Sequence, residues 1–150
     1  MNETIRSIHD LLIRDLDRLK REIEGYEDEK NLWKVSGEIN NSAGNLALHL
    51  CGNLQHFIGA TLGQSGYIRH RDDEFNLKNV PRVQIIAEIE TTKQAIADTL
   101  AKFDESSMAR QYPIKVFDQP SSNISFLIHL SGHLNYHLGQ INYHRRLLEF

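Results

Sequence analysis

The chain has 150 residues, of which 40% are hydrophobic and 25% are charged, with only three prolines. This size and composition predict one globular domain, residues 1–150, with a core large enough to fold by itself. The formal net charge of −3 disfavours a general nucleic-acid binder, because such proteins present a strongly basic surface.

The sequence also predicts where the protein resides. It contains no run of about 18 apolar residues, so no membrane-spanning helix is expected. Cys51 is the only cysteine, which excludes an internal disulfide and fits a reducing compartment. From residue 3 onward charged and apolar residues alternate, unlike a signal peptide. We therefore expect a cytoplasmic protein.

The first half of the chain predicts two long helices. Residues 2–24 carry apolar side chains at spacings of three and four, namely Ile5, Ile8, Leu12, Leu16, Leu19 and Ile23. Residues 25–40 read as a loop or short helical turn, whose Trp33 is expected to cover one end of the core. A second helix is predicted over residues 42–63, with an inner stripe of Leu46, Leu50, Leu54, Phe57 and Ile58. Cys51 falls at the edge of this stripe and is expected to be buried and inert.

The second half predicts two more helices, over residues 81–103 and 123–148, the latter capped by Ser121, Ser122 and Asn123. The charge-dense connector 67–76 fits either a solvated salt-bridge cluster or the rim of a pocket, where Arg69 or Arg71 would meet an anionic substrate group. Residues 104–122 are the least regular, and residues 114–117 could form a short extended piece. Four helices of about 20 residues predict an all-α four-helix bundle.

Histidines supply the candidate chemistry. His133 and His137 are four residues apart, so on a helix their imidazoles lie one turn apart on the same face. Two such imidazoles can chelate one divalent metal, which then needs a third ligand and keeps an open coordination position. His49 lies on the corresponding flank of the second helix. A bundle that packs these two flanks together would bring His49 to the pair.

A structural role for the same histidines stays open. A single histidine is more often a partly buried hydrogen-bonding residue than a metal ligand, and His129 shows that the four-residue spacing can arise without a metal. His56 is a rival third ligand, and His144 is a rival at the other end of the row. No separate general base is identified. Candidates for that role are Asp72, Asp73, His56 and Tyr136.

The sequence resembles the DinB-like superfamily of bacterial four-helix proteins. The resemblance rests on Leu46-Ala47-Leu48-His49-Leu50 in the second helix. It rests equally on His133-x-x-x-His137 followed by Leu138-Gly139-Gln140-Ile141 in the last helix, and on the chain length and helix order. It covers essentially the whole chain.

This resemblance implies an up-down-down-up bundle that forms a homodimer. It also implies a nickel or zinc ion held by His49, His133 and His137. Characterised relatives are metal-dependent transferases of low-molecular-weight thiols, or thiol-dependent isomerases. The sequence therefore leads to two hypotheses. The first is a metal-dependent thiol transferase or related hydrolase acting on an electrophilic small molecule. The second is a non-catalytic dimeric binding or scaffold module with structural histidines.

Overall fold

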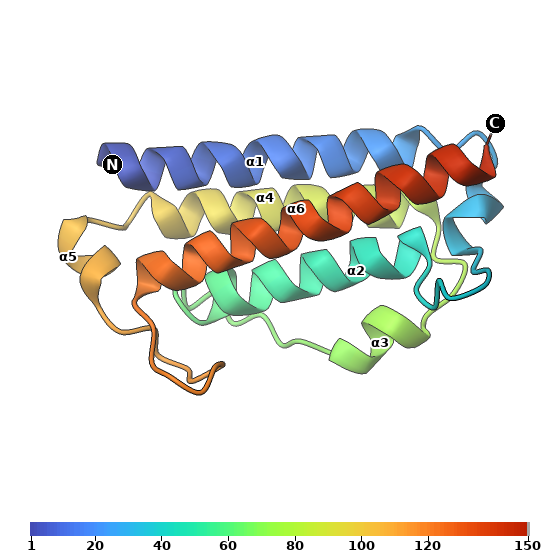
Figure 1. Cartoon of the computed structure of the whole chain (residues 1–150). Helices are drawn as coiled ribbons and strands as arrows, with labels where there is room; N and C mark the ends of the chain where they lie inside the picture. Colours follow the sequence, from blue (N-terminus) through green and yellow to red (C-terminus); the bar gives the residue numbers. More distant parts are fainter. Residues whose placement is uncertain (150) are drawn as a thin grey trace.

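The computed structural model describes residues 1–149, and these form an all-α bundle of four long helices (Figure 1). The long helices are α1 (Glu3–Glu24), α2 (Ala43–Leu54), α4 (Arg82–Leu100) and α6 (Asn123–Leu148). Figure 1 shows α1 and α6 running in one direction and α2 and α4 in the other. The predicted four-helix bundle with up-down-down-up order is thereby confirmed.

Each long helix buries one apolar stripe against its neighbours. α1 packs against α4 and α6, and α2 packs against the same two helices from the other side. The predicted stripes of α1 and α2 lie in this core, together with Ile85, Ile89, Ile96 and Leu100 of α4 and Leu127, Leu130, Leu134 and Ile141 of α6. The packing of α2 against α6 fixes the distance between the histidines that these two helices carry.

The second predicted helix, over residues 42–63, changes its winding partway. Its α-helical part ends at Leu54, and the chain continues as a single π-helical stretch, η2 (Gln55–Ala60). There the N–H groups of Thr61 and Gly63 bond to the carbonyls of His56 and Ile58, each five residues earlier. A π-helical turn inserts one extra residue and shifts the side chains that follow. His56 lies within this π-helical stretch and outside the regular α-helical part that carries His49.

The connecting segments contain three short helices, η1 (Glu29–Trp33), α3 (Arg71–Asn76) and α5 (Glu105–Ala109). The η1 turn matches the predicted short turn around Trp33, which packs against the core. Residues 114–117, which the sequence left as a possible short extended piece without a strand partner, make no sheet. The described residues form no strand, and the segment is joined only by an isolated bridge between Gln111 and Ser122. In the part of the chain that the structure describes, no helix is long and apolar enough to cross a membrane.

Candidate metal centre

Three histidines from two helices meet between α2 and α6. His49 comes from α2, and His133 and His137 come from successive turns of α6. One ring nitrogen from each histidine lies within 4.8 Å of the others. His49 is buried, whereas the other two are half-buried. These are the three residues that the sequence predicted as a ligand set, and we refer to them as the histidine triad.

The spacing within the triad fits a shared cation. Nε2 of His49 lies 3.3 Å from Nε2 of His133. Two nitrogens that each bind zinc at about 2.0–2.1 Å in a tetrahedral site are separated by about 3.3 Å. The ring of His137 stands edge-on to both other rings, with centroids 4.6 Å from His133 and 5.4 Å from His49. The separation of His49 and His133 therefore matches that of two nitrogens on one zinc ion, and a nitrogen of His137 lies within 4.8 Å of both.

Gln140 orients the ring of His137. Nδ1 of His137 lies 2.7 Å from Oε1 of Gln140, one turn further along α6. An amide oxygen only accepts hydrogen bonds, so Nδ1 carries the proton and donates it. In a neutral ring the lone pair then lies on Nε2. This is the tautomer that a metal ligand bonded through Nε2 requires.

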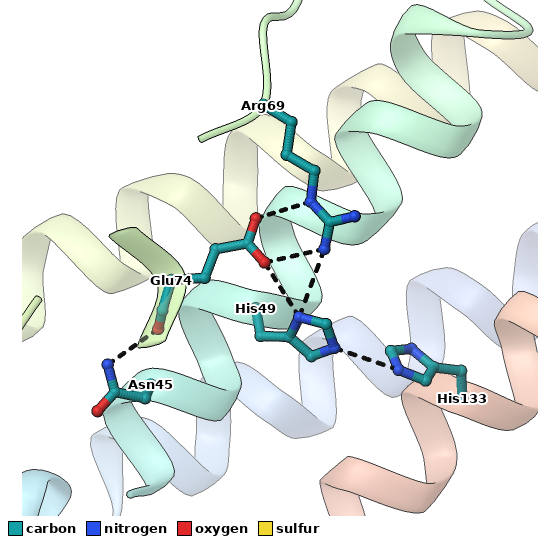
Figure 2. A network of polar contacts seen from close by, with 5 residues as sticks. All are labelled: Asn45, His49, Arg69, Glu74 and His133. Carbon is teal, nitrogen blue, oxygen red and sulfur yellow. Dashed lines mark hydrogen bonds and ion pairs between the residues drawn. The ribbon is translucent and has the colours of Figure 1, made fainter. Parts of the chain in front are cut away.

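A buried ion pair stands behind His49. Oε1 of Glu74 lies 3.0 Å from Nδ1 of His49, and Arg69 donates to both carboxylate oxygens at 2.8 and 2.9 Å (Figure 2). The side chains of Arg69 and Glu74 are only 11% and 7% exposed. Burial alone would raise the pKa of Glu74, but hydrogen bonds from His49 and Arg69 outweigh it and lower this pKa. Glu74 is therefore a carboxylate.

The sequence did not reveal this contact. The connector 67–76 is mostly exposed, as expected of a solvated charge cluster, yet Arg69 and Glu74 turn inward. Arg71, the other predicted anion contact, instead lies over the ring of Phe75 at 5.1 Å. Gly52, on the buried side of α2, leaves space for the Glu74 carboxylate. This relation cannot be recognised without the folded structure.

The ring of His133 has no second anchor. Its Nδ1 is buried and has no hydrogen-bond partner among the described residues. Burial and the neighbouring rings of His137 and His49 lower the pKa of His133 to about 4. Burial also lowers the pKa of His137, with a further contribution from His49, although the bond to Gln140 opposes the shift. Both rings are therefore neutral near pH 7, the protonation state in which histidine binds metals.

The depressed pKa of His133 predicts a pH-dependent stability of the metal-free protein. Unfolded histidine titrates near pH 6.5 and folded His133 near 4, so the unfolded state binds more protons between these values. The free energy of unfolding must then fall as the pH falls through this window, by at most about 1.4 kcal/mol per pH unit for one proton. His133→Gln should flatten this fall, as measured by urea unfolding with a chelator present. His129→Gln, at an exposed position, should keep the wild-type slope. Parallel curves for wild type and His133→Gln would contradict the assignment.

The rival histidines lie outside the triad. His56 lies on η2 and is not a member of the triad. His144 is buried at the far end of α6, where Nδ1 contacts the Tyr26 hydroxyl at 2.7 Å and Nε2 contacts the Lys34 carbonyl at 2.8 Å. Both ring nitrogens of His144 are thus used in fixing the chain after α1. His129 is exposed and packs edge-on against Phe117.

Of the candidate general bases, only some lie near the triad. Asp72 and Asp73 are exposed on α3. Tyr136 lies beside the triad, with its ring centroid 5.2 Å from that of His137.

Cys51 is buried, and burial raises the pKa of its thiol to about 12. The expected burial of this thiol is therefore confirmed.

A groove opens beside His137. It has a volume of about 740 Å³ and runs between the residues that precede α2 and the second half of α6. Its wall combines amide side chains, including Asn40 and Asn41, with the rings of Tyr136 and Tyr143. Glu38 is the one charged residue among its lining residues, apart from any charge on the histidines. His137 is the one member of the triad among the lining residues, so a small molecule in the groove would approach the triad from the side of His137.

Comparison with protein families places the chain in a family without assigning a reaction. A family model described as "Protein of unknown function (DUF1572)" matches residues 2–149, so the chain belongs to this family. The curated proteins contain no match to the chain.

Proposed function

We propose that this member of the DUF1572 family binds one divalent metal through the histidine triad and uses it to activate a small thiol, or water, as a nucleophile. The convergence of three imidazoles from two helices carries this proposal. The rings of His49 and His137 each face a hydrogen-bond acceptor through Nδ1, which leaves Nε2 for a metal.

The proposal includes membership of the DinB-like superfamily. The helix order supports it, as do the positions of the shared motifs on the helices. His49-Leu50 lies on α2, and His133-x-x-x-His137 with the following Leu-Gly-Gln-Ile lies on α6. The proposed metal is nickel or zinc, the ions that the resemblance to the DinB-like superfamily implies, and neutral imidazoles suit both.

Three protein ligands leave a coordination position for a substrate. A divalent metal there supplies a thiolate or hydroxide near neutral pH by lowering the pKa of the bound group. The proposed reaction transfers the thiol sulfur to an electrophilic small molecule: the S–H proton leaves to solvent, a sulfur–carbon bond forms and a leaving group departs. The groove beside His137 would hold the electrophile between its amide and aromatic side chains.

Cobalt(II) substitution tests this function, because a thiolate bound to cobalt gives a sulfur-to-metal charge-transfer band in the near ultraviolet. We expect this band when a small thiol is added to the cobalt-loaded wild type, and no band with His133→Ala. Consumption of free thiol in the presence of an alkylating electrophile should show the same dependence on His133. If the spectrum of the cobalt-loaded protein does not change with any thiol tested, the thiol-transferase activity is ruled out and hydrolysis is the activity to examine.

The proposed partner is a second copy of the chain. α6 exposes four large side chains, with Ile128, Tyr136, Tyr143 and Leu147 between 58% and 66% accessible. Exposed apolar groups gathered on one element are typical of association surfaces. Static light scattering should give twice the 17.3 kDa chain mass, and Ile128→Glu, at an exposed α6 position outside the groove, should halve it. A monomeric wild type at micromolar concentration would contradict this proposal.

A further inference from the structure

Glu74 reaches the triad from outside the bundle. It lies on α3, a six-residue helix in the connector between η2 and α4. Asn45, in the first turn of α2, holds this helix in place, since its Nδ2 donates to the carbonyls of Glu74 at 2.9 Å and Leu77 at 2.8 Å. Figure 2 shows the Glu74 carboxylate directed at His49 from this anchored backbone. The connector is therefore fixed to α2 at the position where it faces the triad.

Gly52 makes room for the carboxylate. It lies three residues after His49 and therefore on the adjoining turn of the same face of α2. A Cβ atom added at Gly52 would overlap the Glu74 carboxylate and would lie only 2.6 Å from its Cδ. No side chain larger than hydrogen fits at position 52 while Glu74 keeps its place. The glycine on α2 and the glutamate on α3 are thus sterically matched.

Arg69 determines the direction of the hydrogen bond to His49. Its Nε donates to Oε2 and its Nη2 donates to Oε1 of Glu74. A guanidinium has only donors, and a carboxylate that is ion-paired to it through both oxygens has only acceptors. Nδ1 of His49 lies 3.0 Å from Oε1 of Glu74 and 3.4 Å from Nη2 of Arg69. An unprotonated Nδ1 would set its lone pair against the carboxylate at the shorter distance, so Nδ1 is assigned as the donor to Glu74. The lone pair of the neutral ring then lies on Nε2, the atom that faces His133 at 3.3 Å.

We infer that Glu74 is a positioning residue that holds His49 as the Nδ1–H tautomer with its Nε2 lone pair on the triad, and that Gly52 and Arg69 are needed for it to do so. The tautomer is a property of the metal-free protein. Only its consequence for metal affinity rests on the proposed function. Loss of a carboxylate behind a ligating histidine typically lowers metal affinity 10- to 100-fold.

Nitrogen-15 NMR of the metal-free protein, labelled on histidine and recorded at about pH 8.5, where unperturbed histidine is neutral, reads the tautomer directly. We expect His49 in the wild type to be protonated on Nδ1. Glu74→Gln preserves the shape of the side chain, and Gly52→Ala displaces the carboxylate without altering it. Both should give a mixture of tautomers. Gly132→Ala, at an α6 position where a Cβ meets nothing within 4 Å, should keep the wild-type spectrum.

Zinc affinity, measured by competition with a chromophoric chelator, gives the second result. It should fall about 10- to 100-fold in Glu74→Gln and Gly52→Ala and stay unchanged in Gly132→Ala. An Nε2–H tautomer in the wild type, or an Nδ1–H tautomer that survives both changes, would overturn the inference. A protein whose tautomer responds as expected but that binds no metal would support the positioning role and remove the proposed function instead.

Discussion

Replacing His133 with alanine should abolish specific metal binding. His133 is the middle member of the triad, 3.3 Å from His49 and one turn from His137. Without it two imidazoles remain, too few for the tight site that three provide. We expect zinc affinity to fall by more than the roughly 100-fold typical of a lost supporting residue. Zinc at about 100 times its Kd should stabilise the wild type by about 2.7 kcal/mol, and that gain should vanish in the variant.

His129→Ala is the matched control. His129 lies one turn before His133 on the same helix, is exposed, and is outside the triad. Its removal should leave both the zinc affinity and the zinc-induced rise in melting temperature unchanged. A His133→Ala protein that folds and still binds zinc as tightly as the wild type would contradict the assignment of His133 as a metal ligand. Equal losses in both variants would point to nonspecific binding along the histidine row.

Removing the Glu74 carboxylate should cause a large loss of stability in the metal-free protein. Glu74→Ala leaves the Arg69 guanidinium, 11% exposed, without its ion-pair partner, and it leaves Nδ1–H of His49 without an acceptor. Breaking a buried pair from one side costs about 3–5 kcal/mol. Urea unfolding should show a decrease of this size in the free energy of unfolding.

Two further variants separate this effect from general damage to α3. Asp72→Ala removes an exposed carboxylate two residues away, and its effect should stay within about 0.5 kcal/mol. Replacing both charges, with Arg69→Met and Glu74→Leu together, should recover much of the stability, because it leaves no buried charge unpaired. A loss below about 1 kcal/mol for Glu74→Ala would mean that the pair is solvated and weak.

The long helices were predictable because their apolar residues recur with the period of an α-helix. The same period made a meeting of His49 with His133 and His137 possible, since it places these residues on the flanks of two stripes that can pack together. The choice of this set over His56 and His144 came from the resemblance to the DinB-like superfamily. The π-helical turn at Gln55–Ala60 could not be predicted, because one inserted residue hardly alters the apolar pattern. His56 was a rival ligand because it lies seven residues from His49 on the same predicted face, and the structure places it outside the triad.

The contact between Glu74 and His49 could not be predicted, for a different physical reason. It joins residues 25 positions apart through a short helix with no apolar period. A connector rich in Arg, Asp and Glu is normally solvated. The Asn45 anchor and the space above Gly52 let Glu74 turn inward, where it pairs with Arg69. Both are features of the folded surface of α2, and neither has a recognisable sequence pattern.

The central claim is that the triad binds a metal, and the most direct test is the metal content of the native protein. The chain should be purified without a histidine tag or chelator and analysed by inductively coupled plasma mass spectrometry. We predict about one nickel or zinc ion per chain, as expected for one three-histidine site, and its loss in His49→Ala and His133→Ala. A protein that holds no metal, even after reconstitution with either ion, would contradict the claim. The bond between His49 and His133 would then be structural, and a non-catalytic scaffold would be the better account.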